Sequence, residues 1–109
     1  MDPNGKEASV ARERLHTEQE RLDKLLSTLR HEHERDGAIH QLGGDAAADT
    51  TSETTYLGVR QDLQQQVKNV DAALKRVDAG TYGIDELTGE PIDPARLEAE
   101  PTARTNVPR

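Results

Sequence analysis

The stretch EASVARERLHTEQERLDKLLSTLR, residues 7–30, decides the fold because its apolar residues recur alternately three and four positions apart. This spacing lays one apolar stripe along a helix and is typical of a coiled-coil seam. Glu18 is the one polar interruption, and charged residues occupy the other faces. We therefore predict a helix from Gly5 to about Arg35, with its seam at Ala8, Ala11, Leu15, Leu22, Leu25 and Leu29.

A second run with the same periodicity predicts a second long helix, with its seam at Tyr56, Val59, Leu63, Val67, Val70, Leu74 and Val77. Thr50 and Glu53 fit a capping box at its start, and Gly80 can take the left-handed conformation that ends helices. Neither helix would be stable alone in water, so each needs the seam of the other. The connection, residues 36–52, is short relative to the helices. The expected fold class is therefore all-α, an antiparallel helical hairpin with this connection as its tip.

The chain has little apolar material for its length. Its 109 residues include 20 Leu, Ile and Val, two Tyr, and no Phe or Trp, and the net charge is −7. A composition of this kind cannot build a compact core of ordinary size. A pair of long helices packed along a narrow seam is still possible, because a coiled coil needs apolar residues at only two positions in seven.

Composition also argues against several classes of function. The chain has no Cys, no apolar run of the ~20 residues that cross a bilayer, and no apolar signal core at its N-terminus. A cytoplasmic protein with no membrane partner is expected. The acidic balance disfavours contact with nucleic-acid phosphates, so we expect no direct sequence-specific DNA binding. No catalytic set or phosphate-binding loop is evident, so neither enzymatic activity nor a cofactor is expected.

Residues 80–109 differ in character and are interpreted as a small C-terminal module, appended to the hairpin of residues 1–79. Proline and glycine residues rule out long helices here. Asp93 as N-cap and Pro94 as first helical residue predict a short helix that ends at Ala99. The core candidates are too few for independent stability: Tyr82, Ile84, Leu87, Ile92, Leu97 and Val107.

The segments ALKRVDAGTYG (residues 73–83) and TGEPIDPARLEAEPTA (residues 88–103) resemble the DksA/TraR family of bacterial transcription regulators. The hairpin before them is similar to that family in layout more than in residues. The resemblance implies a helical hairpin that carries a four-cysteine zinc finger. It also implies binding to RNA polymerase, with the hairpin entering the secondary channel of the enzyme.

The resemblance places the four zinc-ligand positions of the family at Asp85, Thr88, Asn106 and Arg109, separated by two, seventeen and two residues. None of them is Cys or His, and zinc needs soft or borderline ligands in a tetrahedral set. We therefore expect a degenerate finger that holds no metal.

Structural zinc can supply on the order of 10 kcal/mol to the folding of a small finger, and something must replace it. One hypothesis is an ion pair between Asp85 and Arg109 across the former metal site, with Thr88 and Asn106 hydrogen-bonding around it. The alternative is that apolar residues of the C-terminal module dock on the base of the hairpin: Tyr82, Ile84, Leu87 and Leu97.

The resemblance further implies acidic residues at the hairpin tip that approach the catalytic magnesium region of the polymerase. The tip pattern of the family is Asp, two residues, Asp, one residue, Ala. Asp49 holds the second acidic position, Asp45 lies one residue before the first, and Thr51 stands at the Ala position. Each Asp has a plainer alternative: Asp49 can compensate the positive end of a helix, and Asp45 can be a turn residue.

Arg96 stands where the family motif has a basic residue, so it is a candidate for partner contact. The alternative is a salt bridge to Glu100 or Glu86. The four histidines have no ligand partner at useful spacing, and solvated positions are predicted for them.

The leading hypothesis is a monomeric regulator that binds RNA polymerase through its secondary channel, with an acidic tip directed toward the active site. The alternative is a coiled-coil protein–protein interaction module that has kept this scaffold and lost polymerase binding. A third interpretation, a metal-binding module, rests on the family pattern alone.

Overall fold

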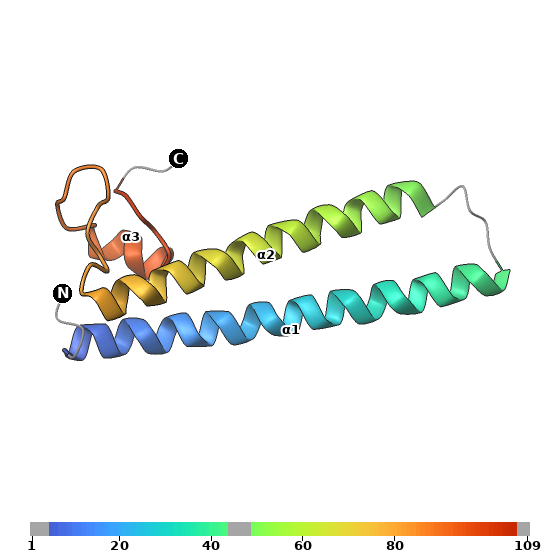
Figure 1. Ribbon diagram of the computed structural model, residues 1–109, viewed down its shortest axis with the longest axis horizontal. Helices are drawn as coiled ribbons and strands as arrows, with labels where there is room; N and C mark the ends of the chain where they lie inside the picture. The colour runs from blue at the N-terminus through green and yellow to red at the C-terminus, as the bar shows by residue number, and fades with distance from the viewer. Residues whose placement is uncertain (1–4, 44–48, 107–109) are drawn as a thin grey trace. The chain divides into compact units, whose positions relative to one another are not determined.

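The computed structural model describes residues 5–43 and 49–106, and the side chains of residues 5–35 and 53–106. Three helices make up most of it: α1, Lys6–Gly43; α2, Asp49–Ala79; and α3, Pro94–Ala99 (Figure 1). Within the described ranges there is no strand, only an isolated antiparallel bridge between Ile84 and Pro91. The predicted all-α helical hairpin is confirmed.

The chain divides into two compact units, each of which contains a stretch of α1 and a stretch of α2. The first unit comprises Met1–Gln19 and Lys68–Arg109, and the second comprises Glu20–Val67. In each unit the two stretches run antiparallel (Figure 1).

In the first unit, polar pairs fix the register of the two helices. Arg12 Nη2 lies 3.0 Å from Asp78 Oδ1, and Gln19 Nε2 donates to Asp71 Oδ1 at 3.0 Å. The partners on α1, Arg12 and Gln19, are seven residues apart, and their partners on α2, Asp78 and Asp71, are seven residues apart in the opposite direction. This is the antiparallel alignment that brings the two apolar stripes together.

The apolar core of the first unit's helices is built from small and aliphatic side chains: Ala8, Ala11, Leu15, Val70, Ala73 and Val77. Five of these six belong to the predicted seams, and Ala73 was not predicted. Alanine at three positions keeps the two helices close, because side-chain size sets the distance between packed helices.

In the second unit the predicted seam is partly wrong. Leu22 is fully buried, but Leu25 is 40% exposed and Val59 is 43% exposed, whereas Leu26 and Leu29 are partly buried. The seam shifts from Leu25 to Leu26 because a straight α-helix turns every 3.6 residues, so a strict 3.5-residue stripe drifts by ~20° per heptad.

Both helices extend into the predicted tip. α1 continues to Gly43, eight residues beyond the predicted end at Arg35, and α2 begins at Asp49, one residue before the predicted cap Thr50. Adding a residue to an existing helix is far easier than nucleating one, which accounts for the longer α1. Where the hairpin gives way to a separate C-terminal module stays a prediction.

The ends of α2 and α3 follow the sequence signals. Gly80 has a positive φ of 78°, and the N–H groups of Thr81 and Tyr82 both donate to the carbonyl of Arg76, which closes the last turn of α2. Asp93 caps α3 by accepting from Ala95 N at 2.9 Å. These two predictions are confirmed.

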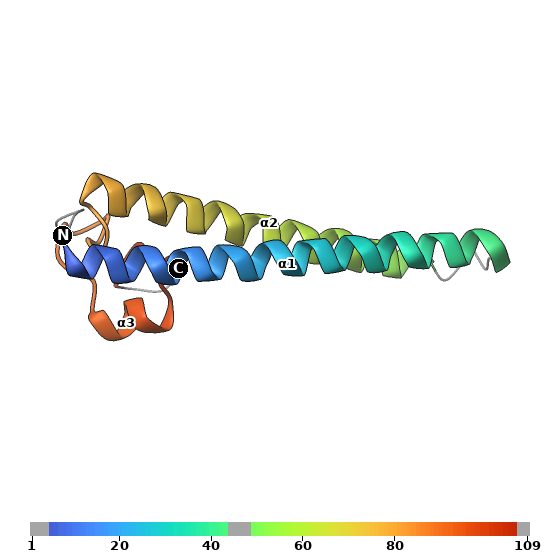
Figure 2. The ribbon, with the colours of Figure 1, turned by 90° about the horizontal axis from the view of Figure 1, so that it is seen from below.

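The helix α3 lies beside the first turns of α1 (Figure 2). Arg14 Nη2 donates to the carbonyl of Glu98, at the end of α3, at 2.6 Å. This contact ties the C-terminal module to the first unit's part of the hairpin. No described helix is long and apolar enough to cross a membrane.

The shifted seam predicts unequal costs for two neighbouring leucines. Leu22→Ala should destabilise the protein by about 2–5 kcal/mol, because it empties a fully buried site. Leu25→Ala should cost less than about 1 kcal/mol, since that side chain is already substantially exposed. Urea unfolding followed by circular dichroism measures the loss of stability in both variants. Equal losses would contradict the shift and indicate that Leu25 packs in the seam.

A second prediction concerns the glycine inside α2. A Cβ added at Gly58 would meet nothing within 4 Å, so Gly58→Ala should stabilise the protein by about 0.5–1 kcal/mol. Gly89→Ala is the matched control: it also has open space, but its φ of 74° makes a side chain unfavourable by about 1–2 kcal/mol. The midpoint temperature of thermal unfolding should therefore rise in Gly58→Ala and fall in Gly89→Ala.

Candidate functional site

The C-terminal module begins with a loop that closes on itself. The N–H of Asp85 donates to the carbonyl of Glu90, and the N–H of Gly89 donates back to the carbonyl of Asp85, each at 2.8 Å. Ile92 N donates to Gly83 O at 2.7 Å. Gly83 and Gly89 both have positive φ, 81° and 74°, a conformation that glycine adopts without strain. The loop is thus a compact knuckle held by main-chain hydrogen bonds.

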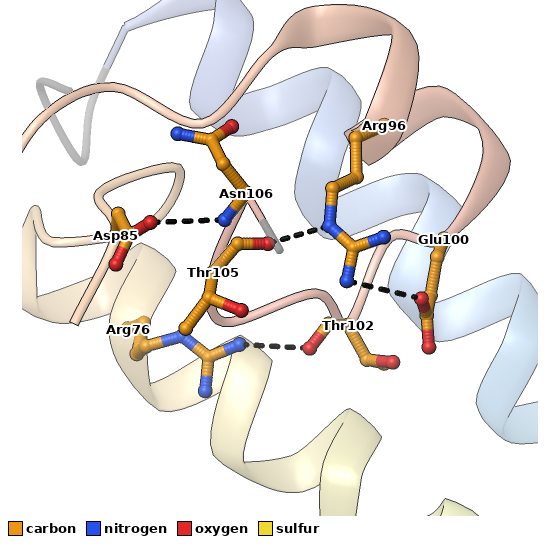
Figure 3. Close-up of polar contacts among 7 residues, drawn as sticks. All are labelled: Arg76, Asp85, Arg96, Glu100, Thr102, Thr105 and Asn106. Carbon is orange, nitrogen blue, oxygen red and sulfur yellow. Dashed lines mark hydrogen bonds and ion pairs between the residues drawn. The ribbon is translucent and has the colours of Figure 1, made fainter. Parts of the chain in front are cut away.

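The carboxylate of Asp85 occupies the centre of this loop. It is 3% exposed, and its Oδ1 accepts from the N–H groups of Leu87, at 2.7 Å, and Thr88, at 3.2 Å. Its Oδ2 accepts from Asn106 N at 2.9 Å (Figure 3). Burying a charge is costly unless it is paired or hydrogen-bonded, and these three charge-assisted bonds provide that compensation.

Two more of the positions where the resemblance implies zinc ligands hold main-chain groups. Asn106 Oδ1 accepts from Asp93 N at 2.7 Å, and its Nδ2 donates to Pro91 O at 3.1 Å. Thr88 Oγ1 accepts from Glu90 N at 3.2 Å. Arg109 lies outside the described residues, so the predicted ion pair of Asp85 with Arg109 stays a prediction.

The donors at these positions do not suit zinc. Both oxygens of Asp85 already accept N–H groups, and Thr88 and Asn106 offer a hydroxyl and an amide rather than a thiolate or an imidazole. Across the described residues, no three His, Asp or Glu side chains gather where they could hold a metal ion. The described part of the site is therefore built for hydrogen bonding.

A cluster of arginines lies beside this site, and Figure 3 shows two of them. Arg96 Nε donates to Thr105 O, and its Nη2 lies 3.8 Å from Glu100 Oε2. The i,i+4 salt bridge offered as one reading of Arg96 is therefore present. Glu86, the other acid considered, lies 3.9 Å from Arg104 instead.

Arg76 connects the end of α2 to this cluster. Its Nη2 donates to Thr102 O at 3.4 Å. Burial lowers the pKa of the Arg76 guanidinium, and the positive charge of Arg104 lowers it further. A groove in the same unit is lined by Asn69, Glu86, Arg96, Glu100, Thr102, Ala103, Arg104 and Thr105. Because carboxylates and carbonyls already contact its arginines, the groove is not a free cationic site.

Tyr82, in the GTYG turn, anchors the apolar side of the module. It is buried, and its hydroxyl donates to Pro101 O at 2.8 Å. Burial raises the pKa of Tyr82, while the charges of Arg14 and Arg76 act in the opposite direction. A buried phenol with one good acceptor stabilises the fold in its neutral form.

The predicted core of the module is correct for Tyr82 and Ile92, which are buried, and wrong for Leu87, which is 65% exposed. The N–H of Leu87 faces Asp85, and its side chain faces solvent. Ile84 and Leu97 are partly buried, and Val107 lies outside the described residues. Ala103, with 5% exposure, completes the core and was not predicted.

Of the predicted tip residues, Asp45 lies outside the described residues. Asp49 is the first residue of α2 and Thr51 lies in its first turn, and the side chains of both fall outside the described part. The N-terminal end of a helix carries partial positive charge, so the position of Asp49 suits the helix-compensation alternative. Asp49 also stands at the second acidic position of the family's tip pattern, so its position does not separate the two alternatives.

One contact in the second unit was missed. The imidazole of His33 stacks on the ring of Tyr56, with centroids 3.7 Å apart and planes 2° apart, and its Nε2 lies 3.4 Å from Glu53 Oε2. The side chain of His33 is 35% exposed, so the predicted solvated position is only partly correct and missed these contacts. The signal was present, because position 33 follows Leu29 by four and so continues the seam.

Comparison with known proteins supports the resemblance seen in the sequence. No family model matches the chain. It is 44% identical over 63 residues to "RNA polymerase-binding transcription factor DksA" of Caulobacter vibrioides, which is 58% of this chain and 44% of that protein. It is 39% identical over 57 residues to "General stress protein 16O" of Bacillus subtilis, or 52% of this chain and 35% of that protein.

The fold agrees as well. The solved structure of transcription factor DksA2 from Pseudomonas aeruginosa superposes with a TM-score of 0.83 at 25% identity, over 94% of this chain and 79% of that one. The chain is DksA-like. The matched segments nevertheless cover less than half of the curated DksA relative's length. In this DksA-like chain, hydrogen-bonding side chains stand at three of the four positions where the resemblance implies zinc ligands.

The environment of Tyr82 predicts a pH dependence. Its folded pKa lies above the usual value of about 10, so the stability it contributes is present below pH ~10 and is lost as the pH rises further. At neutral pH, Tyr82→Phe should cost about 1 kcal/mol through the lost bond to Pro101. The gap between native protein and variant should narrow above pH ~10 in urea unfolding, and a constant gap would contradict the assignment.

Proposed function

We propose that this chain binds RNA polymerase through its secondary channel and regulates transcription, with the hairpin tip directed toward the active site of the enzyme. The observation that carries the proposal is the combined match to DksA proteins, 44% identity over 63 residues to one and a TM-score of 0.83 to another. One of these is named as an RNA polymerase-binding transcription factor. The proposal extends that activity to this chain.

The second unit has the properties of an element that inserts into a partner. Among its described apolar side chains, only Leu22 is fully buried, and the stacked rings of His33 and Tyr56 supplement the seam. Elements that bind partners are often drawn from the less stable parts of a fold. Insertion would supply the burial that this unit lacks.

The proposed mechanism uses negative charge at the tip. Asp45 and Asp49 would approach the catalytic magnesium region, where carboxylates repel or order nearby ligands or reach a cation through water. Thr51 would contact the polymerase close by, and Arg96 would make a further contact from the C-terminal module. With a net charge of −7, the protein would act without direct sequence-specific binding of DNA, as a cytoplasmic monomer and not as an enzyme.

The second candidate is an interaction module that has lost polymerase binding. It is favoured by exposed apolar side chains in the second unit, Leu25, Leu57 and Val59, with Leu57 49% exposed. Such residues can pack against a partner helix. This candidate predicts a dimer or a stable hetero-complex, whereas the regulator predicts a monomer when free.

The two candidates are separated by co-purification with core RNA polymerase. The native chain, Asp45→Ala, Asp49→Ala and the double variant are compared in binding and in transcription from a purified template. Asp62→Ala is the matched control, because Asp62 is an exposed carboxylate on α2 that, among the described residues, accepts only from Gln66, four residues on. The native chain and the control should bind and alter transcription, and the double variant should bind but lose most of its effect.

Absence of binding by the native chain would exclude the regulator, and a dimer in sedimentation would then favour the interaction module. Binding with a transcriptional effect that survives both tip substitutions would retain polymerase as the partner and exclude the acidic-tip mechanism. The ionic strength must be fixed throughout, since charge-based contacts weaken with salt.

A further inference from the structure

We infer that the Asp85 carboxylate is the structural replacement for a metal ion in the C-terminal module. A zinc ion in a small finger joins chain segments that have few other reasons to stay together. Asp85 does the same with its two oxygens: Oδ1 holds the turn of residues 86–88, and Oδ2 holds the main chain at Asn106, twenty-one residues away.

A carboxylate suits this position because it only accepts hydrogen bonds and has room for about four of them. It accepts hydrogen bonds from three N–H groups, two in the turn of residues 87–88 and one at Asn106. Without the carboxylate, these N–H groups on two separate segments would share no acceptor. Its 3% exposure means that water does not offer these N–H groups an easy substitute.

The side chain of Asn106 extends the connection to a third segment. The main-chain N–H of Asn106 donates to Asp85. Its side-chain amide donates to Pro91 O and accepts from the N–H of Asp93, the residue that caps α3. Three stretches of chain, around residues 85–88, 91–93 and 106, are thus joined through two side chains. Both side chains stand at positions where the resemblance implies zinc ligands.

The requirement is for the charge and shape of Asp85 and not for metal. Asp85→Asn keeps the size of the side chain but replaces one acceptor oxygen with an NH₂ donor, which would have to face an N–H group. Asp85→Glu keeps the charge but moves it by one methylene. The first change should open the module at Asn106, and the second should loosen it less.

The test is amide hydrogen exchange by NMR on the full chain, read at Leu87, Thr88 and Asn106. In Asp85→Asn, exchange at Asn106 should be about tenfold faster or more, with the amides of α2 near Val70 unchanged. Asp78→Asn is the matched control: it makes the same chemical change in the same unit, at an exposed carboxylate paired with Arg12, and should leave all three amides as in the native chain. Adding EDTA or zinc to the native chain should change none of them.

Native exchange rates at Asn106 in Asp85→Asn would overturn the inference, and so would stoichiometric bound zinc whose removal by EDTA exposes Asn106. If Asp85→Asn unfolds the whole chain, Asp85→Glu decides: exchange between that of the native chain and that of the unfolded chain supports the inference, and native rates contradict it. None of these outcomes depends on polymerase binding, so the inference and the proposed function fail or stand separately.

Discussion

Scarcity of apolar side chains is the constraint on which the rest of this structure depends. With 20 Leu, Ile and Val and no Phe or Trp, the chain can only fold by pairing long helices along a narrow stripe. In the first unit, small side chains such as Ala8 and Ala73 belong to a stripe that is mostly buried. Where α1 and α2 pass through the second unit, Leu22 is the one fully buried apolar side chain among those described.

Polar groups supply contacts between chain segments that the apolar stripe does not provide, and they do so in two ways. On the helices they are exposed pairs, such as Arg12 with Asp78, which set register but contribute under about 1 kcal/mol each. In the C-terminal module they are buried and multiply bonded, as at Asp85. Only the buried kind can organise a loop with few apolar residues, because there the loss of one partner leaves others unsatisfied.

The sequence was sufficient for features that depend on neighbouring residues. Helix existence, the Asp93 cap and the Gly80 stop each follow from a few adjacent positions. The predicted seam was wrong at Leu25 and Val59, since a small error in helical period accumulates along helices of 38 and 31 residues. The role of Asp85 was only half visible: an Asp at the start of a turn predicts its bonds to residues two and three ahead, but not the third bond to Asn106.

The bond to Asn106 shows how a knuckle-like loop can be held together without cysteine or histidine ligands. Asp85 meets the N–H groups of its own turn at the positions two and three residues on, and this local part requires no distant partner. Joining that turn to Asn106 then requires one acceptor in place of a tetrahedral ligand set. Gly83, Gly89 and the Ile84–Pro91 bridge fix the main-chain path of the loop itself, so the carboxylate has only to join that loop to Asn106. A single carboxylate is chemically sufficient for that.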